Sequence, residues 1–177
     1  MALYNVEAIN IKSFDLGEAD KLITLFSKER GKIRAVAKGA RRIRSRFGGR
    51  LEVLCQNKVL LSEGRSLDQL QQFETIESFF RLKENMETLS TALYFTWLVD
   101  KGTEEKHANE PLYNLLADCL MLLAQGHDVN SVRNVFQRKI LEIEGIMPQL
   151  GEYVSDRMFE KYFGDYASLK QVVSPRS

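Results

Sequence analysis

Cysteine and histidine are scarce in this 177-residue sequence, and their scarcity excludes several kinds of site. Cys55 and Cys119 are too few for a disulfide framework, and both fall in apolar patterns typical of core positions. His107 and His127 lie in polar segments between expected helices, where a surface or capping role is expected. These four residues do not have the spacing of a zinc site. The sequence therefore predicts neither a metal nor another cofactor.

Catalytic and nucleotide-binding motifs are also missing. Neither G-x-x-x-x-G-K-[ST] nor G-x-G-x-x-G occurs, so the glycines at 39, 48 and 49 do not make a phosphate-binding loop. Glu142 and Glu144 share an expected helix but have opposed orientations, which does not suit an acid–base pair. We therefore do not expect an enzyme.

Long apolar runs are absent as well. No run reaches the ~18 apolar residues of a transmembrane helix. The N-terminal stretch MALYNVEAINIK lacks the basic region and apolar run of a signal peptide. The apolar fraction of 44% is ordinary for a globular chain of one domain or two small ones. A cytoplasmic protein without a membrane partner is the expectation.

Positive charge is concentrated in one stretch of the sequence. Residues 28–50 hold ten basic residues against one acid, Glu29, so the total of +1 hides a strongly polarised chain. Such a field is typical of polyanion binding, most often of nucleic acid. Arginine outnumbers lysine by seven to three in this stretch, and arginine forms bidentate bonds to phosphate and stacks on bases. A solubilising face and an acidic protein partner are the alternatives.

Alternating apolar and polar residues predict strands in the N-terminal part. Strands are expected at residues 3–13, 20–27, 33–38, 51–62 and about 67–76. The first has a slip in its pattern at Ala8–Ile9, which suggests a bulge or a change of face. Residues 14–18 are expected to form a loop, and Gly31 can supply positive φ in the next turn. Five short strands, three plus two, favour a Greek-key barrel of the OB type, with an SH3-like barrel as the alternative.

From about Phe79 the apolar period changes from 2 to 3.6, which predicts helices. They are expected over about 79–102, 110–126, 130–145 and 155–163. Asn109 or Glu110 can cap the second helix and Asn130 the third. The predicted fold class is therefore α+β with segregated parts. An OB-type nucleic-acid-binding barrel would occupy residues 1–78 and an all-α domain residues 79–177.

The connector, residues 39–50 with the sequence GARRIRSRFGGR, joins the third and fourth strands. It is basic and poor in core residues, and we interpret it as mobile or partly ordered. Phe47 could stack on an exposed base or could anchor the connector to the barrel. The predicted primary nucleic-acid contacts are Lys38, Arg41, Arg42, Arg44, Arg46, Phe47 and Arg50. A secondary field is expected from the preceding hairpin through Lys28, Arg30, Lys32 and Arg34.

Residues 17–52, GEADKLITLFSKERGKIRAVAKGARRIRSRFGGRLE, closely resemble the bacterial DNA repair protein RecO family. The segments AVAKGARR and SRFGG are the most specific. The helices that end at a G-x-x-P stretch, Gly145 to Pro148, are also similar, and the resemblance extends over about residues 3–150. It implies an N-terminal OB-fold and a helical C-terminal domain.

The resemblance also implies a function. The family's recombination mediators bind single- and double-stranded DNA and anneal complementary strands. They act with RecR and single-stranded-DNA-binding protein in loading RecA at gaps. By position, the family's basic surface corresponds to Lys38, Arg41, Arg42, Arg44, Arg46 and Arg50. Many members carry a four-cysteine zinc insertion after the G-x-x-P stretch, but this chain has none of those cysteines and is short for the family, so zinc is not expected.

Two other functions stay open on the residues alone. The chain could be a protein-interaction adaptor, in which the amphipathic helical part docks an acidic, hydrophobic tail and the basic stretch supports that docking. An OB module with a basic connector could also bind RNA, because backbone charge is common to both polymers. Only the resemblance favours DNA.

Overall fold

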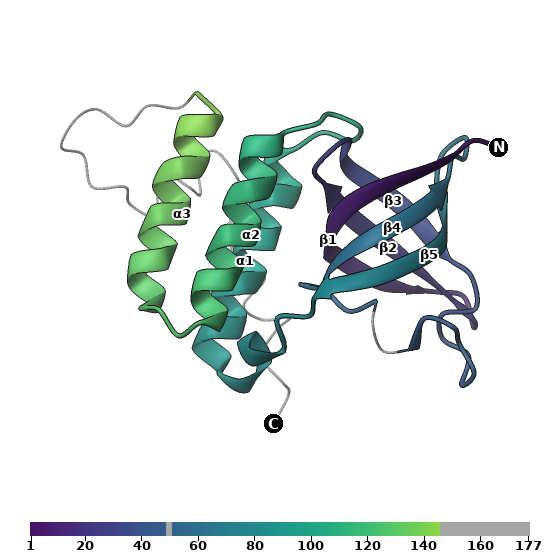
Figure 1. Cartoon of the computed structure of the whole chain (residues 1–177), viewed down its shortest axis with the longest axis horizontal. Coiled ribbons are helices and arrows are strands. Elements are labelled where there is room, and N and C mark those ends of the chain that lie inside the picture. Colours follow the sequence, from purple (N-terminus) through teal and green to yellow (C-terminus); the bar gives the residue numbers. More distant parts are fainter. Residues whose placement is uncertain (49–50, 146–177) are drawn as a thin grey trace.

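The computed structural model describes residues 1–48 and 51–145, which form a five-stranded barrel followed by helices (Figure 1). The strands are β1 (Leu3–Leu16), β2 (Asp20–Ser27), β3 (Gly31–Ala37), β4 (Gln56–Ser62) and β5 (Asp68–Glu77). They close in the order β1-β2-β3-β5-β4, with β3 and β5 parallel and the other neighbours antiparallel. The OB-type barrel expected from the sequence is therefore confirmed.

Strand β1 is buried on both faces in its middle, over residues 8–11. Val6 and Ala8 point into the barrel core, whereas Ile9 and Ile11 pack with the helices. β1 pairs with β4 without interruption from Leu3 to Ile9, so the expected bulge at Ala8–Ile9 is wrong. The alternation of apolar and polar residues is lost at Ala8–Ile9 because the barrel core covers one face of the strand and the helices cover the other. The bulge lies at Ile11, between the paired positions of Asn10 and Lys12.

Two strand boundaries also differ from the expectation. β1 continues to Leu16, where a loop is predicted, because Phe14 and Leu16 still have cross-strand partners on β2. β4 begins at Gln56 rather than at residue 51. The preceding Leu54 has a left-handed backbone, with φ of 79°, which a strand does not accommodate. Its buried side chain packs with the helices.

The helical part begins with a short 3₁₀ helix, η2 (Phe80–Glu84), which is followed by α1 (Met86–Gly102). The sequence predicts one helix over about residues 79–102. Its end at Gly102 is confirmed, but its continuity from residue 79 is wrong because Asn85 interrupts it. The Asn85 side chain accepts hydrogen bonds from the backbone N–H groups of Glu87 and Thr88 and so starts a new helix.

Two further helices follow, α2 (Glu110–Ala124) and α3 (Val129–Ile143). Asn109 caps α2, which confirms one of the two expected caps. Asp128, and not Asn130, caps α3 by accepting from the backbone N–H of Ser131 at 2.9 Å. The expected fourth helix lies outside the described residues. None of the described helices is long and apolar enough to cross a membrane.

The core has two parts, one inside the barrel and one between the barrel and the helices. The second joins the helical core to residues on the outside of the barrel. Phe26 of β2, for example, has its ring 6.3 Å from that of Tyr113 on α2. The Tyr113 hydroxyl also donates a hydrogen bond to Glu7 of β1 at 3.0 Å. The helices are therefore packed directly on the barrel, and a domain division at residue 78 stays a prediction.

Candidate nucleic-acid interface

The described part of the connector, residues 39–48, runs as a series of tight turns. Backbone N–H groups of Arg42, Ser45 and Gly48 each donate to the carbonyl three residues earlier, at 3.1, 2.9 and 3.2 Å. These bonds satisfy the backbone locally, without strand partners. These turns agree with the partly ordered alternative of the two that the sequence suggests.

The connector is also tied to the β1–β2 hairpin. The N–H of Gly39 donates to the Asp20 carboxylate at 2.8 Å, and the N–H of Arg41 donates to the Ala19 carbonyl at 2.9 Å. The Arg41 guanidinium donates to the Gly17 carbonyl and lies 3.4 Å from the Asp15 carboxylate. Arg41 therefore fixes the connector in place, and part of its charge is already neutralised by the protein.

Phe47 anchors the connector to the barrel. Its side chain is 1% exposed, and its ring centroid lies 5.7 Å from that of Phe73 on β5. Ala40 of the connector and Leu51, which follows it, are buried in the same cluster. The predicted contact of Phe47 with DNA bases is wrong in this structure, because a buried ring has no face to offer a base.

Four other predicted contacts remain available on the surface. Lys38, Arg42 and Arg44 are exposed, and none forms an ion pair with a described residue. Arg46 is also exposed and lies 4.8 Å from the centre of the Phe47 ring. We call the set Lys38, Arg42, Arg44 and Arg46 the connector basic surface. Arg50 lies outside the described residues.

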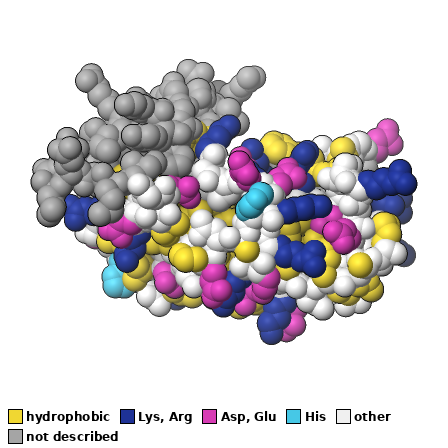
Figure 2. All heavy atoms as spheres, turned by 90° about the horizontal axis from the view of Figure 1, so that it is seen from above, with side chains coloured by type: hydrophobic (Ala, Val, Ile, Leu, Met, Phe, Trp, Pro, Cys, Tyr) yellow, Lys and Arg dark blue, Asp and Glu magenta, His cyan; other side chains and the backbone are white. Residues whose placement is uncertain are grey.

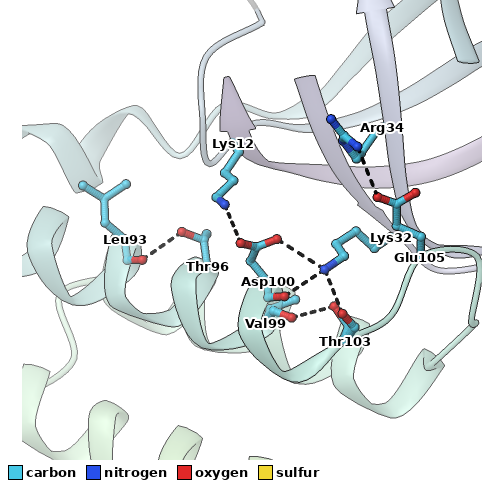
Figure 3. Close-up of polar contacts among 9 residues, drawn as sticks. All are labelled: Lys12, Lys32, Arg34, Leu93, Thr96, Val99, Asp100, Thr103 and Glu105. Carbon is cyan, nitrogen blue, oxygen red and sulfur yellow. Dashed lines mark hydrogen bonds and ion pairs between the residues drawn. The ribbon is translucent and has the colours of Figure 1, made fainter. Parts of the chain in front are cut away.

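The hairpin lysine Lys32 has a different role from the one predicted. Its side chain is 13% exposed, and its Nζ donates to the carbonyls of Asp100 and Thr103 at 2.8 and 2.7 Å (Figure 3). The Asp100 carboxylate lies 3.4 Å from the same nitrogen and 2.6 Å from the Nζ of Lys12. A cation is stabilised there because a helix C-terminus presents unpaired carbonyls. The Nζ of Lys32 is therefore engaged by the helical part, and its contact with DNA stays a prediction.

The other hairpin cations also have partners within the protein. Lys28 lies 3.7 Å from Glu110, and Arg34 lies 3.7 Å from Glu105 (Figure 3). Arg30 lies over the ring of Tyr4, 3.9 Å from its centroid. Both acids belong to the helical part, so the secondary field is largely directed at the helices rather than at solvent. On the face seen in Figure 2, basic and acidic side chains accordingly lie close together.

Sequence reasoning missed one exposed aromatic residue, Phe14. The residue is 56% exposed on the outside of the barrel. The only signal in the sequence is an aromatic residue within a stretch that otherwise has the composition of a loop. Over residues 1–48 and 51–145, no group of three or more His, Cys, Asp or Glu side chains is placed to hold a metal ion.

Comparisons with known proteins match both parts of the chain. The family model "Recombination protein O N terminal" matches residues 1–79, and "Recombination protein O C terminal" matches residues 83–157. The DNA repair protein RecO of Pelotomaculum thermopropionicum is 39% identical over 150 residues, which are 85% of this chain and 58% of the relative. That of Symbiobacterium thermophilum is 38% identical over 155 residues, which are 87% of this chain and 61% of the relative.

A third relative, the DNA repair protein RecO of Desulforamulus reducens, is 37% identical over 150 residues, again 85% of this chain and 58% of the relative. The chain thus spans about three fifths of the length of these relatives. Both family models carry the same family name, and they match the barrel and the helices in the order in which these occur. This chain belongs to the RecO family of DNA repair and recombination proteins.

Proposed function

We propose that this protein binds single- and double-stranded DNA without enzymatic activity and anneals complementary strands. The observation that carries the proposal is the connector basic surface. Its four cations are exposed, and no ion pair with a described residue occupies them. They lie on a segment that Phe47 and Arg41 hold against the barrel. The charge is therefore both available and fixed in position, which favours phosphate binding.

Annealing follows from the same charges. Two DNA strands repel each other through their phosphates, and cations placed between them lower that repulsion. Base pairing then selects the complementary partner, so the protein needs no base-specific contact for this step. Arginine suits this role because its planar guanidinium binds two phosphate oxygens at once.

The partners follow from family membership. We infer that the protein acts with RecR and single-stranded-DNA-binding protein to help load RecA, and that it works in the cytoplasm at the nucleoid. Because the chain spans only 58–61% of the relatives cited above, these partners are proposals for the protein as a whole. A strand-annealing assay with and without single-stranded-DNA-binding protein tests them.

Salt dependence tests the binding mechanism. If all four cations contact phosphates, log K should fall with log salt at a slope of roughly −3 on single strands, since each contact contributes about −0.7. Fluorescence anisotropy with a labelled oligonucleotide measures this slope. A slope near zero would contradict phosphate binding by this surface. Competition with an RNA of the same sequence tests whether the polymer is DNA.

A double variant locates the site. Changing Arg42 and Arg44 to alanine should lower affinity for single-stranded DNA by about tenfold or more and reduce the salt slope by about 1.4. The matched control changes Arg65 and Arg81, two exposed arginines far along the chain, and removes the same charge. Equal losses in the two double variants would show that net charge, and not the connector basic surface, determines binding.

A further inference from the structure

An apolar row crosses the outside of the barrel. Phe14 of β1 pairs with Leu22 of β2, and Leu22 pairs with Val36 of β3. On the parallel side, Val36 pairs with the polar Gln69 of β5, where the apolar row ends. Phe14 is exposed, and Leu22 and Val36 are half-buried, so described residues leave much of the row open to solvent.

The orientation of Phe14 is set by the bulge in β1. Before the bulge, the even-numbered Val6 and Ala8 point into the barrel. The extra residue, Ile11, inverts the alternation, so that the even-numbered Phe14 points outward. Bulges commonly re-aim side chains next to binding sites. Here the bulge places a large apolar ring in water, where a solvated sheet face ordinarily carries a polar residue.

Cations flank this row on both sides. Lys38 lies two residues after Val36, between the end of β3 and the start of the connector. Arg41 ties that connector to the hairpin that continues from Phe14, through Asp15 and Gly17. On the other side, Lys12 and Arg34 each precede a member of the row by two residues and are partly exposed, although both pair with acids of the helical part.

An apolar strip between cations matches the chemistry of a single nucleic-acid strand. Such a strand exposes flat apolar bases on one side and phosphates on the other. In duplex DNA the bases are stacked inside and cannot reach a flat strip on a sheet. The ring of Phe14 is carried by a paired strand, so it is held ready for stacking at little entropic cost.

We propose that Phe14, Leu22 and Val36 form a platform for the bases of single-stranded DNA, with the ring of Phe14 stacked on one base. The connector basic surface holds the phosphates of the same strand. This inference rests on the proposed function, because it takes DNA as the ligand. It adds a preference: single strands use the row and the cations, whereas duplexes use the cations alone.

The test compares three ligands by fluorescence anisotropy: an oligo-dT strand, a blunt duplex of the same length, and an abasic single strand. Phe14→Ala should weaken oligo-dT binding about 5- to 150-fold, which corresponds to the loss of one base–aromatic stack. Binding to the duplex and to the abasic strand should change less than about twofold, and the salt slope should be unchanged. Phe14→Tyr keeps a ring and should keep the affinity.

The matched control is Phe80→Ala, since Phe80 of η2 is 59% exposed, close to the value for Phe14, but lies outside the row. Unchanged oligo-dT binding by Phe14→Ala, or equal losses on all three ligands, would overturn the platform while leaving the proposed function standing. A wild-type protein that binds none of the three ligands would overturn both. Thermal unfolding of each variant verifies that an exposed ring can be removed without unfolding the barrel.

Discussion

The Nζ of Lys32 lies 2.8 Å from the carbonyl oxygen of Asp100, and this hydrogen bond joins strand β3 to the last turn of helix α1. Lys38, six residues further on, is exposed and forms no ion pair with a described residue. Two lysines of one basic stretch therefore have opposite roles. One holds the helices on the barrel, and the other is available to a ligand.

Matched substitutions of these two lysines should separate stability from binding. Lys32→Met leaves the Asp100 and Thr103 carbonyls without their donor and should lower the free energy of unfolding by about 1–3 kcal/mol. Affinity for DNA should stay within twofold. Lys38→Met should do the reverse, with unchanged stability and weaker DNA binding. Urea denaturation and fluorescence anisotropy measure the two effects, and a loss of DNA affinity in Lys32→Met alone would contradict the assignment.

Phe47 should matter for stability and not for base contact. Phe47→Ala removes a ring that packs on Phe73 and should cost about 3–5 kcal/mol of the free energy of unfolding. Phe47→Leu keeps most of the volume and should cost less than about 1.5 kcal/mol, so it is the variant to test for DNA binding. Its affinity for single-stranded DNA should equal that of the wild type. A folded Phe47→Leu protein with a tenfold loss on single strands would restore the stacking role.

Gly31 should tolerate no side chain. Its φ of 71° is unfavourable for other residues, and a Cβ at this position would lie 1.9 Å from the backbone oxygen of His107 in the loop after α1. Gly31→Ala should therefore destabilise the protein by more than about 2 kcal/mol, because the backbone of one segment must move.

Gly17 is the matched control for Gly31. It has a φ of 61°, and a Cβ added at this position would meet nothing within 4 Å beyond its own chain neighbours. Gly17→Ala should therefore cost only the conformational term, about 1–2 kcal/mol. Thermal unfolding compares the two variants. Equal losses would mean that the contact between the β2–β3 turn and the α1–α2 loop does not constrain the position.

The buried thiol of Cys119 should make the protein less stable in alkali. Burial raises the pKa of this thiol to about 12, from an ordinary value of 9.0. Between these values the native state keeps a proton that the unfolded state has lost, so stability is complete below pH 9 and falls as the pH rises. The loss should reach about 1.4 kcal/mol at pH 10.

Urea midpoints at pH 8 and pH 10 test the role of Cys119. Cys119→Ala is expected to lower both midpoints, because it leaves a cavity in α2's packing, but to reduce the difference between them. Tyr4 and Tyr113, whose pKa values are also raised by burial, contribute equally in both proteins. An unchanged difference in the variant would show that Cys119 does not titrate in this range.

The sequence predicts an element best where residue composition and turn signals agree on the same bounds. Strand β2 was predictable over its whole length because its residues combine β-forming composition with clear turns at each end. The break between η2 and α1 at Asn85 could not be predicted from the sequence pattern. Leu82 and Leu89 continue a helical period across it, while the cap depends on an amide side chain turning back to the backbone.

The sequence could not predict whether a given basic side chain faces solvent or bonds to another part of the protein. Lys32 and Lys38 look alike in the sequence, and only the packing of α1 on the barrel distinguishes them. Phe14 was missed for a related reason, since the face on which it lies depends on a single bulged residue. The concentration of arginine in the connector was visible, but its attachment through Asp15 and Asp20 required the fold.

The bulge at Ile11 marks one point at which the length of β1 can vary by a single residue. Asn10 pairs with Leu25 and Lys12 with Thr24, so removing Ile11 would leave a regular strand in which Ser13 and Phe14 keep their partners and their faces. The change would cost the packing of the buried Ile11 side chain against the helices. Among homologous chains, a single-residue deletion within this strand should therefore fall at the bulge.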